Sequence, residues 1–141
     1  MVYGNTETLG NYHTIDFRGG VFITTKNIIK MKLAFLTEKY GFDFECSDKS
    51  GMHYVFKNEN GYIEFYEWEQ FGESAIFVKY DKNFREIKLI EEYPKIIGSF
   101  YQNHKGFKWL FKDVRKDYWK MISIILEIEI AEKGSLFGLK V

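Results

Sequence analysis

Glutamates and large aromatic residues alternate in one segment of the chain, residues 59–73. The segment holds five glutamates and no lysine or arginine, which gives it a formal charge of −5. In an extended strand, successive side chains point to opposite faces. Ile63 and Phe65 would then point to the core, and Glu64, Tyr66 and Trp68 would point outward.

An outward strip of carboxylates and rings is suited to binding another protein. Large rings supply rigid contact area, and carboxylates select a basic partner and accelerate encounter. The alternative is a solvated sheet face whose glutamates pair across the strands with Lys57 or Lys79. A glycosidase-like pair of glutamates is a third interpretation. The predicted partner-binding residues are His53, Glu59, Glu64, Tyr66, Trp68 and Glu69.

The three histidines and the single cysteine show no spacing typical of a metal site. His13, His53 and His104 are spread along the chain, and none pairs with another at i+2 or i+4. Cys46 lies at an apolar position of a predicted strand, as a small buried cysteine would. His53, next to the acidic segment, is the histidine best placed to act as a general base. An enzyme would need His53 or Cys46 beside a carboxylate in a cleft.

Well-known phosphate-binding and catalytic motifs are missing from the sequence. The glycines form neither GxGxxG nor GxxxxGK[ST], and neither GxSxG nor HExxH occurs. We therefore predict no catalytic residue, no metal site and no cofactor.

The charges balance overall but are separated along the chain. Twenty basic residues match twenty acidic ones, so the formal net charge is +0. Residues 105–120 carry six basic and two acidic residues, a local charge of +4. The lack of a basic excess argues against a general nucleic-acid binder. The basic stretch is expected to be the solvated side of an amphipathic helix, able to pair with the acidic segment within one molecule or in a homodimer.

Turn residues divide the chain into strands that run together and helices that are segregated from them. A hairpin is predicted at 11–25, and a helix at 27–40 with Asn27 as its N-cap and Gly41 after its end. Asn60-Gly61 predicts a tight turn between strands 52–57 and 62–71. The other predicted elements are strands at 42–46 and 75–80, a strand or helix at 84–90, helices at 94–106 and 107–133, and an apolar tail at 135–141.

This order predicts an α+β fold. We expect an antiparallel meander sheet of about five to seven strands, packed against one N-terminal-side helix and two C-terminal helices. The length of 141 residues suits a single domain over residues 1–141, with residues 1–10 loose. Aromatic residues make up 19% of the chain, which predicts a ring-rich core.

The sequence contains no apolar run of about 18 residues and no basic start followed by an apolar stretch. We therefore expect a cytoplasmic protein without a membrane partner.

Two neighbouring stretches, LAFLTEKYGFDFE at 33–45 and HYVFKNENGYIEFYEW at 53–68, resemble small bacterial proteins of unassigned function. Several of those proteins are cytoplasmic immunity proteins that neutralise a co-encoded toxin. The resemblance covers residues 28–90 and implies a binding role. Because many nuclease toxins are basic, the acidic segment is independently consistent with that role.

The expected function is therefore a non-enzymatic one, binding a basic protein through the outward face of the central sheet. The alternative is a small-molecule-binding domain with an aromatic-lined cavity between the sheet and the helix at 107–133.

Overall fold

The alternating apolar residues in the middle of the chain form a five-stranded antiparallel sheet in the computed structural model, which describes residues 14–15, 21–22, 24–47, 53–66, 75–104 and 114–141. The strands lie in the sheet in the order in which they follow along the chain, which confirms the predicted meander and the α+β class. They are β3 (Asp43–Ser47), β4 (His53–Asn58), β5 (Gly61–Tyr66), β6 (Ala75–Tyr80) and β7 (Asn83–Lys88).

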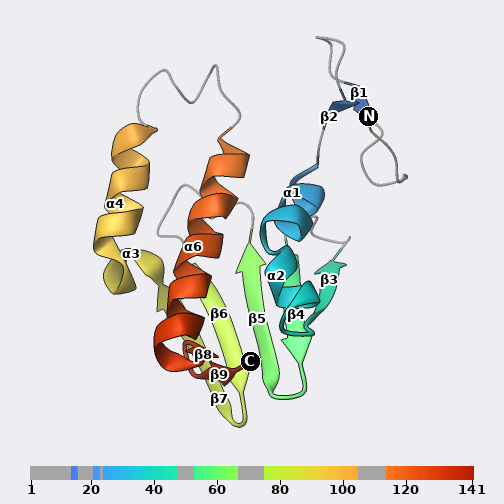
Figure 1. The fold of residues 1–141 in the computed structure, drawn as a ribbon, viewed down its shortest axis with the longest axis vertical. Helices are drawn as coiled ribbons and strands as arrows, with labels where there is room; N and C mark the ends of the chain where they lie inside the picture. The colour runs from blue at the N-terminus through green and yellow to red at the C-terminus, as the bar shows by residue number, and fades with distance from the viewer. Residues whose placement is uncertain (1–13, 16–20, 23, 48–52, 67–74, 105–113) are drawn as a thin grey trace.

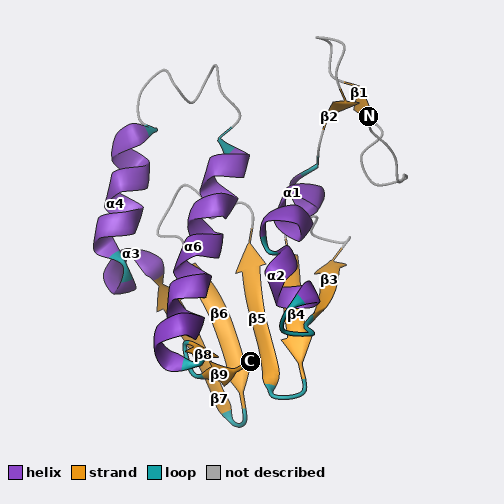
Figure 2. Ribbon diagram, in the orientation of Figure 1, coloured by secondary structure: helices purple, strands orange, loops and turns teal. Residues whose placement is uncertain are grey.

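Helices cover one face of this sheet (Figures 1 and 2). The short helices α1 and α2 pass in front of β3 and β4, α6 passes in front of β6, and α4 lies beside α6 (Figure 1). Within the described part of the chain, no helix packs on the opposite face. The helices are α1 (Thr25–Lys32), α2 (Ala34–Glu38), α3 (Leu89–Glu92), α4 (Pro94–Asn103) and α6 (Arg115–Lys133).

Burial alternates along the strands, as the sequence predicts. Ile63 and Phe65 of β5 are buried on the helix side, which confirms their predicted direction. Trp119 of α6 meets Phe65 edge to face, with ring centroids 5.6 Å apart. The buried residues of the neighbouring strands on this side are Tyr54, Phe56, Ile76, Val78 and Ile87. Large rings thus supply much of the core, because each buries a large apolar area.

The helix predicted at 27–40 is in fact two helices, and its predicted N-cap is wrong. Thr24 is the N-cap of α1, and its side-chain oxygen accepts a hydrogen bond from the backbone N–H of Asn27 at 3.3 Å. Helix α1 ends at Leu33, whose φ of −106° and ψ of 21° are not helical. Leu33 and Leu36 are both fully buried, so the two short helices bury apolar side chains on either side of the break.

The C-terminal third largely follows its predicted pattern. Segment 84–90 divides into most of β7 and the start of α3. Helix α4 begins at Pro94, and α6 ends at Gly134, whose φ of 69° is the left-handed conformation expected of a C-terminal glycine cap. The predicted start of the last helix at residue 107 lies outside the described residues.

Two small hairpins complete the fold. The predicted hairpin near the N-terminus is present as β1 (Thr14–Ile15) paired with β2 (Val21–Phe22). The apolar tail forms β8 (Ser135–Leu136) and β9 (Leu139–Lys140), and Leu136 and Leu139 are fully buried against the core.

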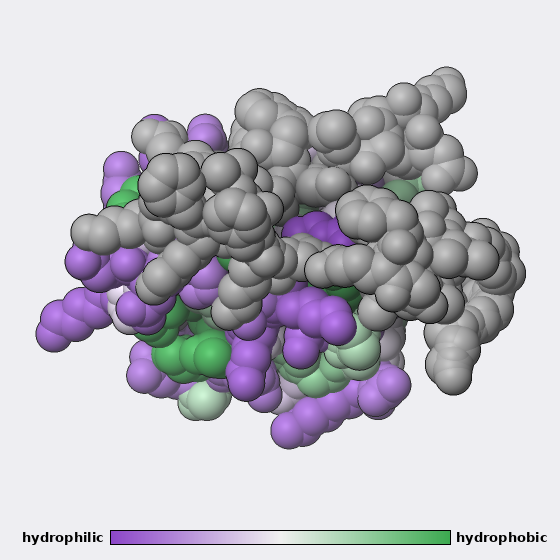
Figure 3. Space-filling model, turned by 90° about the horizontal axis from the view of Figure 1, so that it is seen from above, coloured by the Kyte–Doolittle hydropathy of each residue, from purple (hydrophilic) through white to green (hydrophobic). Residues whose placement is uncertain are grey.

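Viewed from the end of the molecule where α6 begins, the described surface is mostly hydrophilic, with smaller hydrophobic areas between the charged side chains (Figure 3). None of the helices in the described ranges has the length and apolar composition needed to cross a membrane.

Candidate protein-binding face of the sheet

The face of the five-stranded sheet that no described helix covers is named the open face. Its side chains alternate along each strand with the buried ones. Glu64 lies near its centre, because β5 is the third of five strands and Glu64 pairs with Val55 on β4 and Phe77 on β6. The outward direction predicted for Glu64 and Tyr66 is therefore correct.

Four rings form a ladder across the open face, one from each of the strands β4 to β7. His53 stacks on Tyr66 with centroids 4.8 Å apart. Tyr66 meets Phe77 edge to face at 5.5 Å, and Phe77 stacks on Phe84 at 5.8 Å. Phe84 is 58% exposed, a large ring at one end of the ladder with little to cover it. These four residues are called the ring ladder below.

Glu64 is recessed among these rings. Its carboxylate Oε2 accepts a hydrogen bond from the Tyr66 hydroxyl at 3.2 Å and lies 3.1 Å from Nε2 of His53. The Glu64 side chain is only 13% exposed, less than the 26% of His53. The His53–Glu64 contact is within ion-pair range but is not aligned as a hydrogen bond, and Nε2 of His53 is buried without a hydrogen-bond partner among the described residues.

Tyr62 lies on the same side of β5, two residues before Glu64. Partial burial raises the pKa of the Tyr62 hydroxyl, and the negative charge of Glu64 and a hydrogen bond to it raise that pKa further. The neutral phenol is therefore favoured at physiological pH. The carboxylate of Glu64 thus has a tyrosine on each side along its own strand.

One lysine on this face makes a cross-strand pair of the kind expected of a solvated strip, although its partner lies outside the acidic segment. Lys57 forms an ion pair with Glu45 of β3, with Nζ and Oε2 2.9 Å apart. This hydrogen bond, and then the charge of Glu45, raise the pKa of Lys57. Tyr62 of β5 pairs with Lys57 of β4 on one side and with Lys79 of β6 on the other.

Glu59 lies away from the other predicted binding residues. It occupies the turn between β4 and β5, whereas His53 and Tyr66 pair at the opposite end of these strands. The turn is held by Asn58, whose Oδ1 accepts hydrogen bonds from the backbone N–H groups of Asn60 at 2.8 Å and Gly61 at 3.1 Å. The predicted tight turn is confirmed, and a side chain at Gly61 would overlap the Lys79 carbonyl oxygen.

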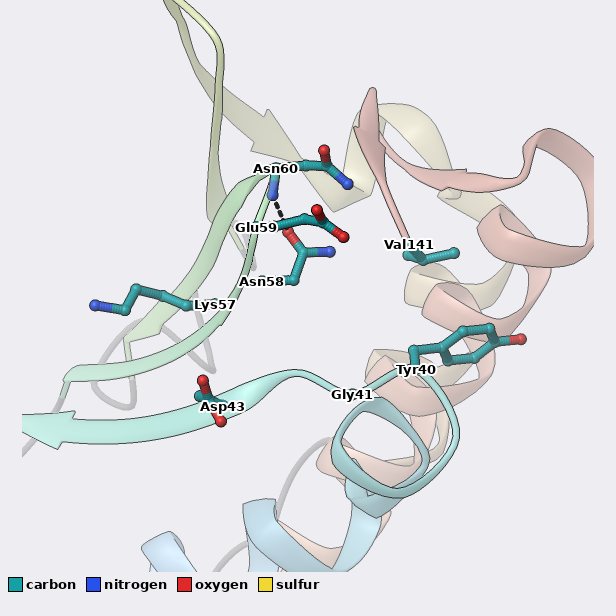
Figure 4. Close-up of a pocket in the computed structure, with 8 residues that line it drawn as sticks. All are labelled: Tyr40, Gly41, Asp43, Lys57, Asn58, Glu59, Asn60 and Val141. Atoms are coloured by element: carbon teal, nitrogen blue, oxygen red, sulfur yellow. Dashed lines mark hydrogen bonds between the residues drawn. The ribbon is translucent and has the colours of Figure 1, made fainter.

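This turn borders an open cleft of about 510 Å³ (Figure 4). The side chains lining it are mixed in charge and converge on no single polar centre. They come from the end of α2, the start of β3, the β4–β5 turn and the last residue of the chain. The lining residues are Tyr40, Gly41, Asp43, Lys57, Asn58, Glu59, Asn60 and Val141.

Three of the six predicted binding residues, His53, Glu64 and Tyr66, come together on the open face. Trp68 and Glu69 lie outside the described residues. Sequence reasoning missed Phe77 and Phe84. The signal for Phe77 was present, because Ile76 and Val78 were apolar positions of the same strand and Phe77 alternates with them.

The other residues considered for chemistry have structural surroundings. Cys46 is half-buried on β3 and packs against the core. His104 ends α4: its Nδ1 lies 2.8 Å from the Phe100 carbonyl oxygen and its Nε2 3.2 Å from Asp117 of α6. His53 does lie beside a carboxylate, that of Glu64, on the open face. No group of three or more potential metal ligands occurs in the described ranges.

Comparison with known proteins adds no further assignment: no family model, curated protein or solved structure matches this chain. The resemblance to immunity proteins therefore stays a prediction.

Proposed function

We propose that this protein is a non-enzymatic binding domain that holds a basic protein partner on the open face of its sheet. The observation that supports this most is the ring ladder, which crosses a sheet face that no described helix covers, beside a recessed carboxylate.

The rings provide the apolar part of such an interface. A sheet face without a covering layer is usually polar, and contiguous apolar patches typically mark interaction sites. Of the four rings, Phe84 is exposed and the other three are half-buried. Aromatic anchors at the centre of an interface carry a large share of the binding energy. Phe84, 58% exposed at one end of the ladder, is the ring with the most area to gain from a partner.

The charges favour a basic partner. Residues 59–73 carry five glutamates without a basic residue. One of them, Glu64, lies beside the ring ladder. Such a field accelerates encounter with a cationic surface and rejects an acidic one. Together with the resemblance over residues 28–90, this supports a toxin-neutralising, immunity-type role in the cytoplasm.

The alternative, a small-molecule cavity between the sheet and α6, gains no support from the packing there. Phe65, Trp119 and Tyr118 meet at this interface through edge-to-face ring contacts at 5.6 Å and 5.2 Å.

The proposal can be tested by affinity capture from lysate of the source organism, with wild-type protein and two open-face variants as bait. Phe84→Ala removes the exposed ring, and Glu86→Lys reverses an exposed charge in the row of Glu64. Matched controls are Ile124→Ala and Glu127→Lys, because both residues are exposed on α6, on the other side of the sheet.

The expected result is one stoichiometric basic protein, captured by wild type and by both controls. Each open-face variant should weaken its binding by about tenfold or more, as an interface anchor does. Capture should also fall as salt rises. Equal capture by the open-face and control variants would remove the open face as the binding site.

A further inference from the structure

We infer that the recess around Glu64 receives an arginine side chain of the partner, an assignment that rests on the proposed function. The Glu64 recess is defined as Glu64 with the residues around it: Tyr62 and Tyr66 on β5, Val55 on β4 and Phe77 on β6.

The recess is unusual because it withdraws a carboxylate from water on a face that no described helix covers. Withdrawing a carboxylate from water costs free energy unless a cation or several donors compensate. Glu64 is only 13% exposed, yet its partners among the described residues are the hydroxyls of Tyr66 and Tyr62 and a misaligned imidazole. Within these residues, no lysine or arginine forms an ion pair with it. In the described part of the chain, the carboxylate therefore has two tyrosines and a histidine around it in place of a permanent cation.

The carboxylate of Glu64 suits a planar, forked donor. The nearby Nε2 of His53, 3.1 Å from Oε2, is itself buried, so the carboxylate is the group that a partner would reach. A guanidinium carries five donors in a rigid plane and can bond both oxygens of one carboxylate at once, whereas an ammonium acts as a point charge.

The walls of the recess favour the same ligand. Tyr66 and Phe77 meet edge to face, so one ring presents its face toward the edge of the next. Arginine stacks on aromatic faces and is less strongly hydrated than lysine. One lysine of this face, Lys57, is already paired with Glu45 at 2.9 Å.

The test uses short capped peptides as probes and the full chain as receptor. Acetyl-Ala-Arg-Ala-amide is titrated into the millimolar range while the aromatic side-chain resonances are followed by NMR. The matched probe replaces arginine by citrulline, which has the same shape and no charge. A lysine peptide is the third probe.

The arginine peptide is expected to shift the His53 and Tyr66 ring signals saturably. The citrulline peptide should bind at least about tenfold more weakly, and the lysine peptide several-fold more weakly. Glu64→Gln, which keeps the side-chain shape, should lose about tenfold or more in affinity for the arginine peptide. Glu127→Gln on α6 is the matched control and should bind as wild type does.

The inference is overturned if the arginine peptide gives no saturable shift, if citrulline binds equally well, or if Glu64→Gln binds like wild type. A thermal melt of Glu64→Gln shows that the variant is folded before its binding is compared. If the arginine peptide fails while Phe84→Ala still abolishes partner capture, only the arginine assignment falls. If the peptide binds at Glu64 while Phe84→Ala and Glu86→Lys leave capture intact, the proposed function falls instead.

Discussion

Glu64 and Glu129 are two withdrawn carboxylates on opposite sides of one sheet, and their surroundings differ. Glu129 on α6 is fully buried and has three donors. The Tyr93 hydroxyl and Lys133 Nζ, at 3.0 Å, donate to Oε2, and the Phe137 N–H donates to Oε1 at 3.2 Å. Glu64 has tyrosine hydroxyls and an imidazole that does not align with it.

The difference separates a structural carboxylate from a candidate binding carboxylate. Around Glu129, every contact belongs to the fold, and Arg85 of β7 adds a hydrogen bond from Nη1 to the Phe137 carbonyl oxygen at 2.8 Å. The network joins the start of α4, the end of α6 and the β8–β9 turn. Around Glu64, the described residues supply rings, tyrosine hydroxyls and His53, but no lysine or arginine in ion-pair contact. A withdrawn charge is stabilised by such a cation, which the proposed arginine of a partner would supply.

The largest expected effect is on stability, from Glu129→Leu. The variant leaves the Phe137 N–H and the Tyr93 hydroxyl without their acceptor, and the free energy of unfolding should fall by about 3 kcal/mol. Urea unfolding followed by circular dichroism measures the change. Glu127→Leu, two residues away on the exposed side of α6, should stay within about 0.5 kcal/mol of wild type. Similar losses in both variants would mean that the Glu129 network contributes little.

A smaller effect is expected from Tyr93→Phe, and it should depend on pH. Burial raises the pKa of the Tyr93 hydroxyl far above its usual range, and the hydrogen bond to Glu129 and the charge of Glu129 raise it further. The neutral phenol therefore stabilises the folded protein fully below pH about 10, the usual tyrosine pKa. That contribution is lost as the pH rises above this value towards the folded-state pKa.

Tyr93→Phe should accordingly lower the free energy of unfolding by about 1.5 kcal/mol at neutral pH, because a hydrogen bond to a carboxylate is removed. Above pH about 10 the difference from wild type should shrink. Urea unfolding of both proteins between neutral pH and about pH 11 measures this. Curves that stay parallel across this range would show that the Tyr93 proton is not linked to folding.

The sheet could be predicted from the sequence because its signals are local. Alternation with a period of two gives strand faces, and Asn60-Gly61 gives a turn whose geometry fixes the register of β4 and β5. The break at Leu33 was not predictable in this way. Its side chain continues the apolar stripe, and the two halves bury their residues against a sheet formed later in the chain.

The site was predicted only where it lies on one strand. Glu64 and Tyr66 follow from the alternation of β5, but the ring ladder depends on pairings between four strands, which the sequence does not state. Phe84 was missed because segment 84–90 suits a strand or a helix equally well. Glu59 was grouped with Glu64 by closeness in sequence, although the turn places it at the other end of the strand pair.

The smallest expected change in stability, from Glu64→Leu, tests the comparison most directly. If Glu64 is kept for binding, a leucine in the same ring-lined recess should leave the free energy of unfolding unchanged or raise it by up to about 1 kcal/mol. The Tyr66 hydroxyl, on a half-buried side chain of the open face, can then bond water instead. The same variant should no longer bind the arginine peptide. Urea unfolding and the NMR titration give both values on one sample. A loss of stability as large as that of Glu129→Leu would mean that both carboxylates stabilise the fold, and that Glu64 does not lower folding stability in favour of binding.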